Sequence, residues 1–532
     1  MDGDYWQYAM RDKPKFNELV CSGYVTHSLQ DAVQWLDRFI RSTSTSFPDC
    51  FKYKGIRVLG PFEQYKRNVF NKDATRQFEL ARTDCFLTEL EFEFNDNGDI
   101  QTIYRELWIP FGRQGNRMRI YGSMATLHPV VADRLISVTM TGLFIIIQRA
   151  KFNLEKKEYT VVKDGEVFTG NFLESRLHNE GKVKPSETWG SPTTGHYLFA
   201  KYGPVEAFKH YYDTEVYICS REDLDPRYNP DEHYLFTAKD RVGRQRKQRD
   251  TNFALIVPRD KFDKEPGLQI LVISFFYATD YHNTSFRLED IERPADWIKT
   301  LAYTSFQQKD NLATQIAKIE KHLESLEDYI DEMTMEIILD EGLVGVESIY
   351  DLLSFANDNV IDLMRSSNIG SMWGKYLMVK RYVLSSITFQ IILLGWELRK
   401  SREALSLKII KWTLGSKLHP TAFLGIVKGH GEKTNVQYPG DCMLFKHTLI
   451  SVRQIDAVAT PNGKSKINVD DPGYQFDPSI LDSGSVVNFP KGEPDGRKKL
   501  NPFISIDEKG KIIPGPYHEM LLEVKNEMGF DN

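Results

Sequence analysis

Residues 86–108 read FLTELEFEFNDNGDIQTIYRELW, and this stretch is the clearest indication of fold in the chain. From Phe86 to Phe94 apolar and acidic side chains alternate, which is the period of a strand with one buried face. Asn97-Gly98 follows, and Ile100–Trp108 continues in an extended pattern. Because Asn-Gly readily adopts the left-handed backbone of a two-residue turn, the sequence predicts a β-hairpin here.

The same alternation gathers three carboxylates, Glu89, Glu91 and Glu93, on one face of the first strand. Two-metal sites do gather carboxylates, but they usually take them from several elements. The sequence therefore favours a solvated face on an edge strand over a metal site.

More strands are predicted through the first 300 residues, with one short helix at Asp31–Ile40. Lys163-Asp164-Gly165 predicts a second hairpin turn. Leu268–Tyr277 is a nearly continuous apolar run, which predicts a central strand covered on both faces. The remaining predicted strands are Arg117–Tyr121, Leu143–Gln148, Glu158–Val162, Glu166–Thr169, Glu215–Cys219 and Phe253–Val257.

The pattern becomes helical near Pro294. Apolar residues at alternating spacings of four and three run from Leu312 to Ile337, which predicts one helix with a buried stripe, and Gly342 ends it. Such a stripe is expected to be covered, because soluble monomers avoid long exposed apolar patches. Further helices are predicted at about 346–364, 372–400, 402–414 and 517–528.

Strands and helices are segregated along the chain, which argues against repeated βαβ units and predicts an α+β fold. The 532 residues are enough for three to four domains. The predicted division is a mainly-β part with a few helices at 1–293, a helical bundle at 294–420, and a turn-rich, irregular β region with a terminal helix at 421–532.

The chain carries 68 basic and 74 acidic residues, a formal net charge of −6, so any binding to nucleic acid must be local. The charges are unevenly distributed. Lys318–Glu341 has nine acidic and two basic residues, and Lys375–Lys411 has eight basic and two acidic residues. Either these helices belong to a bundle whose surfaces pair or stay solvated, or the basic helices face an acidic partner.

The densest basic segment is 239–250, KDRVGRQRKQRD, with six basic and two acidic residues in twelve. Such a loop cannot bury itself, and arginine suits phosphate oxygens because its guanidinium forms bidentate hydrogen bonds. An ordinary solvated loop is the alternative. The residues predicted to touch nucleic acid or an acidic neighbouring subunit are Arg241, Arg244, Arg246, Lys247 and Arg249.

Motifs for catalysis or metal binding are missing from the sequence. The five cysteines form no CxxC pair and the twelve histidines are scattered, so no zinc site is predicted. Gly425–Thr434 looks like a phosphate loop, but His430 stands where a Walker loop needs its second glycine. Asp223-Leu-Asp225 has the DxD spacing, but its polar setting favours a plain turn. No catalytic residue, metal or cofactor is therefore predicted, and an enzyme whose active-site residues are scattered along the chain stays an open alternative.

The N-terminal segment has no basic region followed by an apolar one, so no secretory signal is predicted. The longest apolar stretch, Tyr382–Leu398, is interrupted by polar residues and is shorter than a spanning helix needs. It is predicted to be a helix buried in a core, with a short interfacial anchor as the alternative, and no membrane partner is expected.

Two stretches resemble proteins of large tailed bacteriophages. The first, between Arg105 and Lys151, contains Trp108-Ile-Pro, Arg119-Ile-Tyr-Gly122 and His128-Pro-Val-Val-Ala-Asp133. The second, between Ser479 and Pro514, contains Ser483-Gly-Ser, Phe489-Pro-Lys and Asp495-Gly-Arg-Lys-Lys-Leu-Asn-Pro502. The resemblance implies a virion component or an accessory part of a phage replication or transcription machine. A promoter-directing subunit of a phage-encoded multisubunit RNA polymerase is one such part. Neither stretch carries a catalytic motif, so no catalytic residue is implied.

Taken with this resemblance, the sequence favours a non-enzymatic subunit of a viral nucleic-acid-handling machine, with transcription as its preferred process. The alternative is a virion structural protein with a packing role only. The expected partners are other protein subunits, with DNA or RNA left open, and the expected location is the host cytoplasm or the virion.

Overall fold

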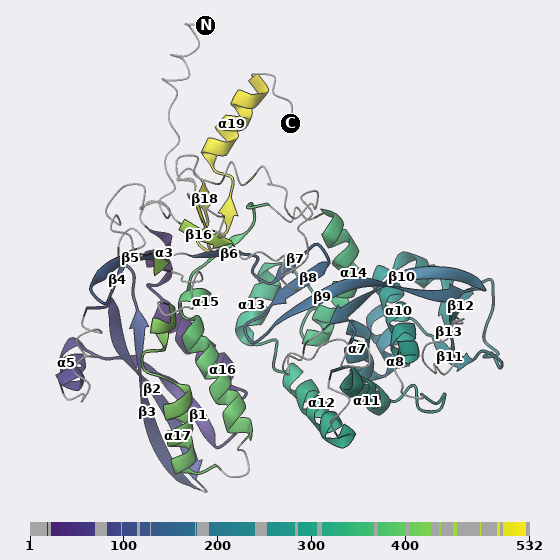
Figure 1. The fold of residues 1–532 in the computed structure, drawn as a ribbon, viewed down its shortest axis with the longest axis horizontal. Coiled ribbons are helices and arrows are strands. Elements are labelled where there is room, and N and C mark those ends of the chain that lie inside the picture. Colours follow the sequence, from purple (N-terminus) through teal and green to yellow (C-terminus); the bar gives the residue numbers. More distant parts are fainter. Residues whose placement is uncertain are drawn as a thin grey trace. The chain divides into compact units, whose positions relative to one another are not determined.

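The structure is a computed structural model that confirms the α+β class, because its N-terminal region is mostly strands and its middle is helical (Figure 1). The residues that it describes are 19, 23–69, 82–96, 98–113, 117–127, 129–175, 177, 191–239, 253–281, 286–305, 311–366, 371–400, 405–426, 436–437, 451–454, 479, 483, 497–500 and 504–527.

Residue contacts divide the chain into two compact units. Unit 1 combines residues 1–134 with 370–532, and unit 2 consists of residues 135–369. The three successive domains expected from the sequence follow the chain in order, whereas unit 1 joins its two ends. The division into domains at 1–293, 294–420 and 421–532 stays a prediction.

The hairpin predicted at Asn97-Gly98 is confirmed in unit 1. Strands β2 (Cys85–Asp96) and β3 (Asp99–Pro110) are antiparallel, and Asp96 pairs with Asp99 across a two-residue connection. Gly98 has a φ of 105°, which side chains disfavour. Strand β1 (Phe51–Val58) pairs with the other edge of β2, so the sheet order is β1-β2-β3.

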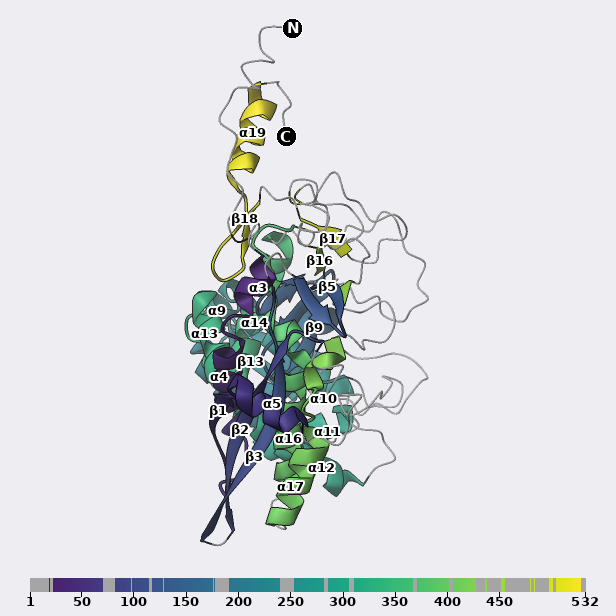
Figure 2. The same cartoon turned by 90° about the vertical axis from the view of Figure 1, so that its left-hand side faces the viewer.

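Helices cover one face of this sheet (Figure 2). They are α4 (Ala32–Ser44), α16 (Ser385–Lys400) and α17 (Leu407–Lys417). Phe51 and Phe92 stack beneath them at 5.2 Å between ring centroids. The opposite face carries Glu89, Glu91 and Glu93. The prediction of an edge strand there is wrong, because β2 is central, and Glu89 is buried between arginines.

The short helix predicted at Asp31–Ile40 is confirmed as α4, and the terminal helix as α19. The predicted helix 372–400 is partly wrong, because the chain first forms strand β14 and the short helix α15 before α16 begins. The remaining elements of unit 1 are α3 (Tyr24–Ser28), α5 (Pro61–Val69), β4 (Arg117–Ile120), β5 (Ser123–Leu127), β6 (Val130–Ala132), β14 (Tyr376–Met378), α15 (Lys380–Val383), η3 (Ala422–Ile426), β15 (Val436–Gln437), β16 (Ser451–Gln454), β17 (Arg497–Lys499), β18 (Ser505–Ile506), β19 (Ile512–Ile513) and α19 (Pro516–Glu527).

Unit 2 is built on a seven-stranded sheet of order β11-β13-β12-β9-β8-β7, with β10 paired to β9. The hairpin predicted at Lys163-Asp164-Gly165 is confirmed, since Lys163 pairs with Glu166. Asp164 and Gly165 both have positive φ, as a type I′ turn requires. The strands are β7 (Ile136–Val138), β8 (Gly142–Ile146), β9 (Lys151–Lys163), β10 (Glu166–Ser175), β11 (Tyr217–Ser220), β12 (His233–Ala238) and β13 (Phe253–Pro258).

The central strand predicted at Leu268–Tyr277 is wrong, because this segment lies within helix α10 (Pro266–Tyr281). The helix packs among α7, α14 and β10, and its apolar side chains are buried around its whole circumference. A segment that is apolar all round has no period from which strand and helix can be told apart. The other helices of unit 2 are α7 (Thr194–Tyr202), α8 (Pro204–Tyr212), α9 (Arg259–Lys264), α11 (Pro294–Ser305), α12 (Leu312–Leu326), α13 (Glu332–Asp340) and α14 (Ile349–Ser366).

The heptad pattern from Leu312 to Ile337 forms two helices rather than one. Helix α12 ends at Leu326, and α13 begins after Asp331, whose carboxylate accepts a hydrogen bond from the backbone N–H of Thr334 at 2.8 Å. An aspartate in this N-cap position stabilises a new helix start. The apolar period continues across the break, which is why the sequence alone predicts a single helix.

Within the part of the chain that the structure describes, no helix has both the length and the apolar character needed to cross a membrane. Cys50, Cys85 and Cys219 are free thiols.

Candidate nucleic-acid interface

The five residues predicted to bind nucleic acid, Arg241 to Arg249, lie outside the described residues, but the hairpin that carries their loop is described. Strands β12 and β13 pair antiparallel, with Thr237 opposite Ala254. The chain therefore leaves the sheet after Ala238 and returns at Phe253.

The root of the loop is rigid. Strand β12 is paired on both edges, by β13 and by β9, and residues Ala254–Val257 of β13 are completely buried. The Arg221 guanidinium donates a hydrogen bond to the carbonyl oxygen of Ala238, which tethers the first end of the loop. A polar loop on a buried scaffold of this kind is a common setting for binding residues.

Beside this root, the DxD segment forms the plain turn that the sequence favours. The Asp225 carboxylate accepts hydrogen bonds from the backbone N–H of Arg227 at 2.9 Å and from its guanidinium at 2.8 and 2.9 Å. The Arg227 side-chain hydrogen bonds lower the pKa of Asp225 to about 2. The same guanidinium lies 3.8 Å from the centre of the Tyr217 ring. Asp225 is thus engaged within its own loop.

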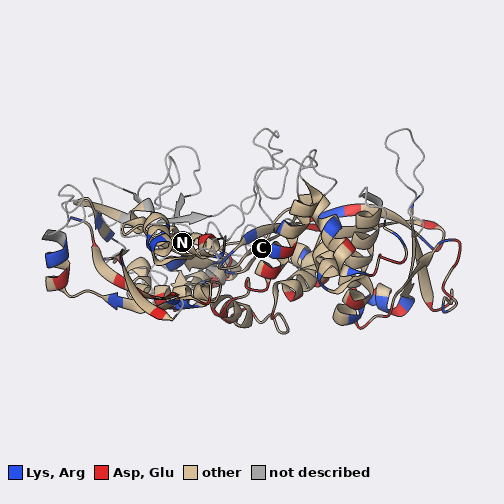
Figure 3. Cartoon of the chain, turned by 90° about the horizontal axis from the view of Figure 1, so that it is seen from below, with Lys and Arg blue, Asp and Glu red and all other residues tan. Residues whose placement is uncertain are grey.

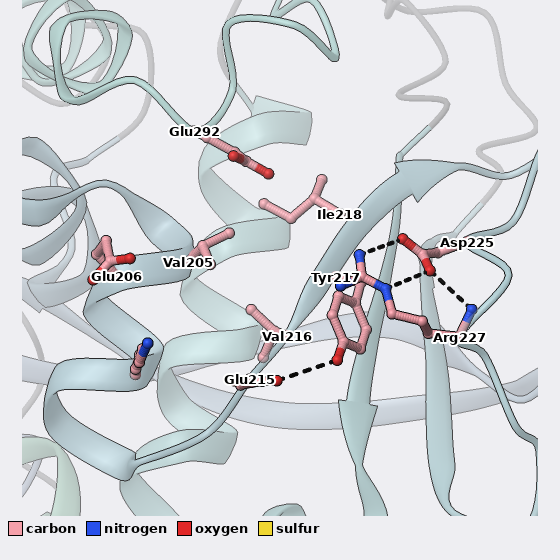
Figure 4. A pocket seen from close by; sticks show the side chains of 10 residues that line it. Val205, Glu206, Glu215, Val216, Tyr217, Ile218, Asp225, Arg227 and Glu292 are labelled. Carbon is pink, nitrogen blue, oxygen red and sulfur yellow. Dashed lines mark hydrogen bonds and ion pairs between the residues drawn. The ribbon is translucent and has the colours of Figure 1, made fainter.

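A shallow pocket of about 270 Å³ adjoins this turn (Figure 4). Its wall includes four carboxylates and two cationic side chains, and the Tyr217 hydroxyl donates to Glu215 at 3.3 Å. The excess of carboxylates would repel phosphate, so the pocket is unsuited to nucleic acid. The lining residues are Val205, Glu206, Lys209, Glu215, Val216, Tyr217, Ile218, Asp225, Arg227 and Glu292.

No metal centre emerges from the described residues, where no three His, Cys, Asp or Glu side chains are grouped to hold an ion. The Gly425–Thr434 stretch lies largely outside the described residues.

The basic stretch Lys375–Lys411 is partly neutralised within unit 1. Lys375 lies 3.2 Å from Asp133, Lys380 lies 2.7 Å from Asp31, and the Arg399 guanidinium donates to the carbonyl oxygen of Ser46 at 2.6 Å. These three cationic side chains therefore stabilise contacts within unit 1. Over the whole described chain, basic and acidic residues are interspersed (Figure 3).

Helices α16 and α17 nevertheless expose large apolar side chains. Phe389, Trp396 and Trp412 are 57%, 50% and 67% exposed, and Lys408 and Lys411 are exposed beside Trp412 in the sequence. The interpretation of Tyr382–Leu398 as a core helix is thus correct for one side only. Helical spacing places Phe389 and Trp396 on the side opposite the buried residues Ile387, Ile391 and Leu394. This spacing is the sequence signal that could have predicted an exposed aromatic face.

A family model described as non-virion RNA polymerase subunit matches residues 4–524. No curated protein matches the chain.

Proposed function

Because this chain belongs to the family of non-virion RNA polymerase subunits, we propose that it is a non-enzymatic subunit that binds nucleic acid for the polymerase. The family places it in viral transcription and makes other polymerase subunits its partners, and it suggests the host cytoplasm as the location. This agrees with the resemblance to phage polymerase subunits seen in the sequence. The finer role in directing the enzyme to promoters belongs to the proposal.

The observation that carries nucleic-acid binding is the loop 239–252 on the β12–β13 hairpin. Five of its six basic residues, Arg241, Arg244, Arg246, Lys247 and Arg249, are the predicted phosphate contacts, and they follow a strand that is paired on both edges. The rigid root fixes where this cationic segment begins and ends, and arginine can form bidentate hydrogen bonds to phosphate. The alternative of a virion packing protein has no comparable support.

Attachment to the other subunits is assigned to a second surface, the exposed side of α16 and α17 around Trp396 and Trp412. Tryptophan is enriched among the residues that dominate protein interfaces. Exposed lysines beside Trp412 suit a partner surface with acidic side chains around an apolar centre. The proposed loop contact with nucleic acid therefore lies in unit 2, and the proposed attachment surface for other subunits lies in unit 1.

The test is to replace the five loop residues by alanine and to assemble the polymerase with this variant. We expect normal assembly and weaker DNA binding, with a flatter dependence of affinity on salt, because each lost phosphate contact reduces the logarithmic slope by about 0.9. A matched control replaces Lys264 and Arg293, two exposed cations of unit 2 outside the loop, and should leave DNA binding unchanged.

Two results would contradict the assignment. If the loop variant binds DNA normally but is lost from the polymerase, the loop holds an acidic protein neighbour. If the variant changes neither DNA binding nor assembly, the loop is solvated surface and nucleic-acid binding must be sought elsewhere.

A further inference from the structure

A cluster of arginines surrounds one buried carboxylate in unit 1, far in sequence from the basic loop. Arg113 follows β3, and Arg119 lies on β4, yet both bind Asp84, which precedes β2. The Asp84 side chain is completely buried, whereas the side chains of Arg113 and Arg119 are each 43% exposed. The carboxylate therefore lies beneath two guanidinium groups that remain accessible to solvent.

The hydrogen bonds fix the orientation of both guanidinium groups. Arg113 donates to Asp84 through Nε at 2.5 Å and through Nη2 at 2.9 Å. Arg119 donates through Nε at 3.1 Å and through its backbone N–H at 2.7 Å. Burial alone would raise the pKa of Asp84, but the hydrogen bonds from the two arginines outweigh it and lower the pKa. Asp84 is therefore held as an anion.

Two further arginines lie on the neighbouring backbone, Arg82 against the turn between β4 and β5 and Arg117 on β4. Strands β4 and β5 are joined by Tyr121 and Gly122, whose φ values of 51° and 87° belong to a type I′ turn. The Gly122 N–H donates to the carbonyl oxygen of Arg82 at 2.8 Å. A Cβ at residue 122 would overlap the Arg82 guanidinium, so that side chain lies directly against the turn. Arg117 is two residues before Arg119 on β4 and pairs with Arg113 through the backbone.

The cluster exceeds what a structural ion pair requires. One arginine can satisfy a buried carboxylate through a bidentate pair, and Arg113 already does so. Arg119 adds a second cation to the same carboxylate. The two guanidinium groups and the carboxylate together therefore carry a net charge of +1. Two exposed cations held in fixed orientations form a ready site for an anion, because little side-chain entropy remains to be lost on binding.

We propose that Arg113 and Arg119, with Arg82 and Arg117 beside them, form a second phosphate-binding site for the nucleic acid held by the polymerase. The site deepens the proposed function by adding a nucleic-acid contact in unit 1 that is separate from the loop of unit 2. Asp84 is its positioning residue: it fixes the planes of Arg113 and Arg119 and touches no ligand itself.

The test uses the assembled polymerase and a labelled DNA duplex, with affinity measured at several salt concentrations. Replacing Arg113 and Arg119 alone would leave Asp84 buried without its partners, so the variant combines R113Q, R119Q and D84N. We expect the three amides to preserve the fold, DNA affinity to fall about tenfold, and the logarithmic salt slope to flatten by about one to two units. The melting temperature of the variant subunit is measured alongside.

A matched control is R41Q, which removes an exposed arginine of unit 1 that is paired with Asp37 at 2.9 Å. It should leave both affinity and slope unchanged. A second variant, R113K with R119K, keeps the charge but loses the bidentate geometry, and we expect an intermediate loss of affinity. This variant retains two cations for Asp84, so it tests the site even if the triple variant does not fold.

Normal affinity and salt slope in both arginine variants would overturn the inference. Loss of the subunit from the polymerase with intrinsic DNA binding unchanged would overturn it too, by assigning the cluster to an acidic protein partner. The loop variant separates this inference from the proposed function. If the loop variant weakens DNA binding and the cluster variants do not, only the inference fails, and if neither does, the proposed function fails as well.

Discussion

Arg67 on helix α5 donates a hydrogen bond to Oε1 of Glu89 on strand β2 across 2.5 Å, although the two residues belong to different elements. Arg57 contacts the other carboxylate oxygen of Glu89 at 2.8 Å. Only 8% of the Glu89 side chain is exposed, so this carboxylate anchors the helix to the uncovered face of the three-stranded sheet.

Replacing Glu89 by glutamine should therefore destabilise unit 1. Burial would raise the pKa of Glu89, but its hydrogen bonds from Arg57 and Arg67 lower it. The stabilisation is present above the unfolded pKa and is lost as the pH falls through the lower folded value. We expect a loss of about 1–2 kcal/mol at pH 7, below the value for fully buried pairs because both arginines are partly exposed. Urea unfolding measures it.

The control for this prediction is E91Q, two residues along the same strand face, which should change the unfolding free energy by less than about 0.5 kcal/mol. If E89Q and E91Q lower the unfolding free energy equally, the loss is a general effect of changing β2, and Glu89 has no special role in anchoring α5.

Asp358 on α14 gives the opposite pH dependence in unit 2. Burial raises its pKa to about 6, although a hydrogen bond with Tyr212 opposes the shift. Because the folded pKa exceeds the unfolded one, stability is greatest below the unfolded value and declines as the pH rises through about 6. We expect D358N to be more stable than the native chain at pH 8 by about 1–2 kcal/mol and to lose this advantage at pH 4. Thermal unfolding across this range measures it, and an unchanged pH profile would contradict it.

The buried stripe of helix α12 predicts that an introduced carboxylate destabilises the protein more where the replaced side chain is more deeply buried. Ile319 is completely buried and Leu323 is partly buried against the core of unit 2. I319D should abolish soluble expression, and L323D should lower the melting temperature or solubility, because each buries an unpaired carboxylate. The exposed neighbour Glu320 supplies the control as E320Q. If L323D is soluble and melts normally, the stripe is not required for folding.

The exposed tryptophans of α16 and α17 predict the attachment surface. The double variant W396A and W412A should fold normally, since both side chains are at least half exposed, but its retention on the other polymerase subunits should fall about tenfold or more. Y65A removes a similarly exposed aromatic side chain from α5 and is the matched control. Retention of the double variant at the native level would exclude this surface as the attachment site.

Local chemistry in the sequence determined the two hairpins, the helices α4 and α14, and the terminal helix. Asn97-Gly98 and Asp164-Gly165 specify their turns through their own backbone preferences, and the neighbouring strands follow from alternation. The family resemblance also came from the sequence, at the stretch that contains Arg119-Ile-Tyr-Gly122.

Tertiary structure decided what depends on residues that are distant in sequence. Helix α10 reads as a strand because an apolar segment has no period of its own, and only the helices and sheet packed around it settle its conformation. The Asp84 cluster is invisible in the sequence because its arginines come from separate segments, each of which looks like ordinary surface. Spacing along the chain reports the period of one element, whereas the approach of Arg113 and Arg119 to one carboxylate depends on how β2, β3 and β4 pack together.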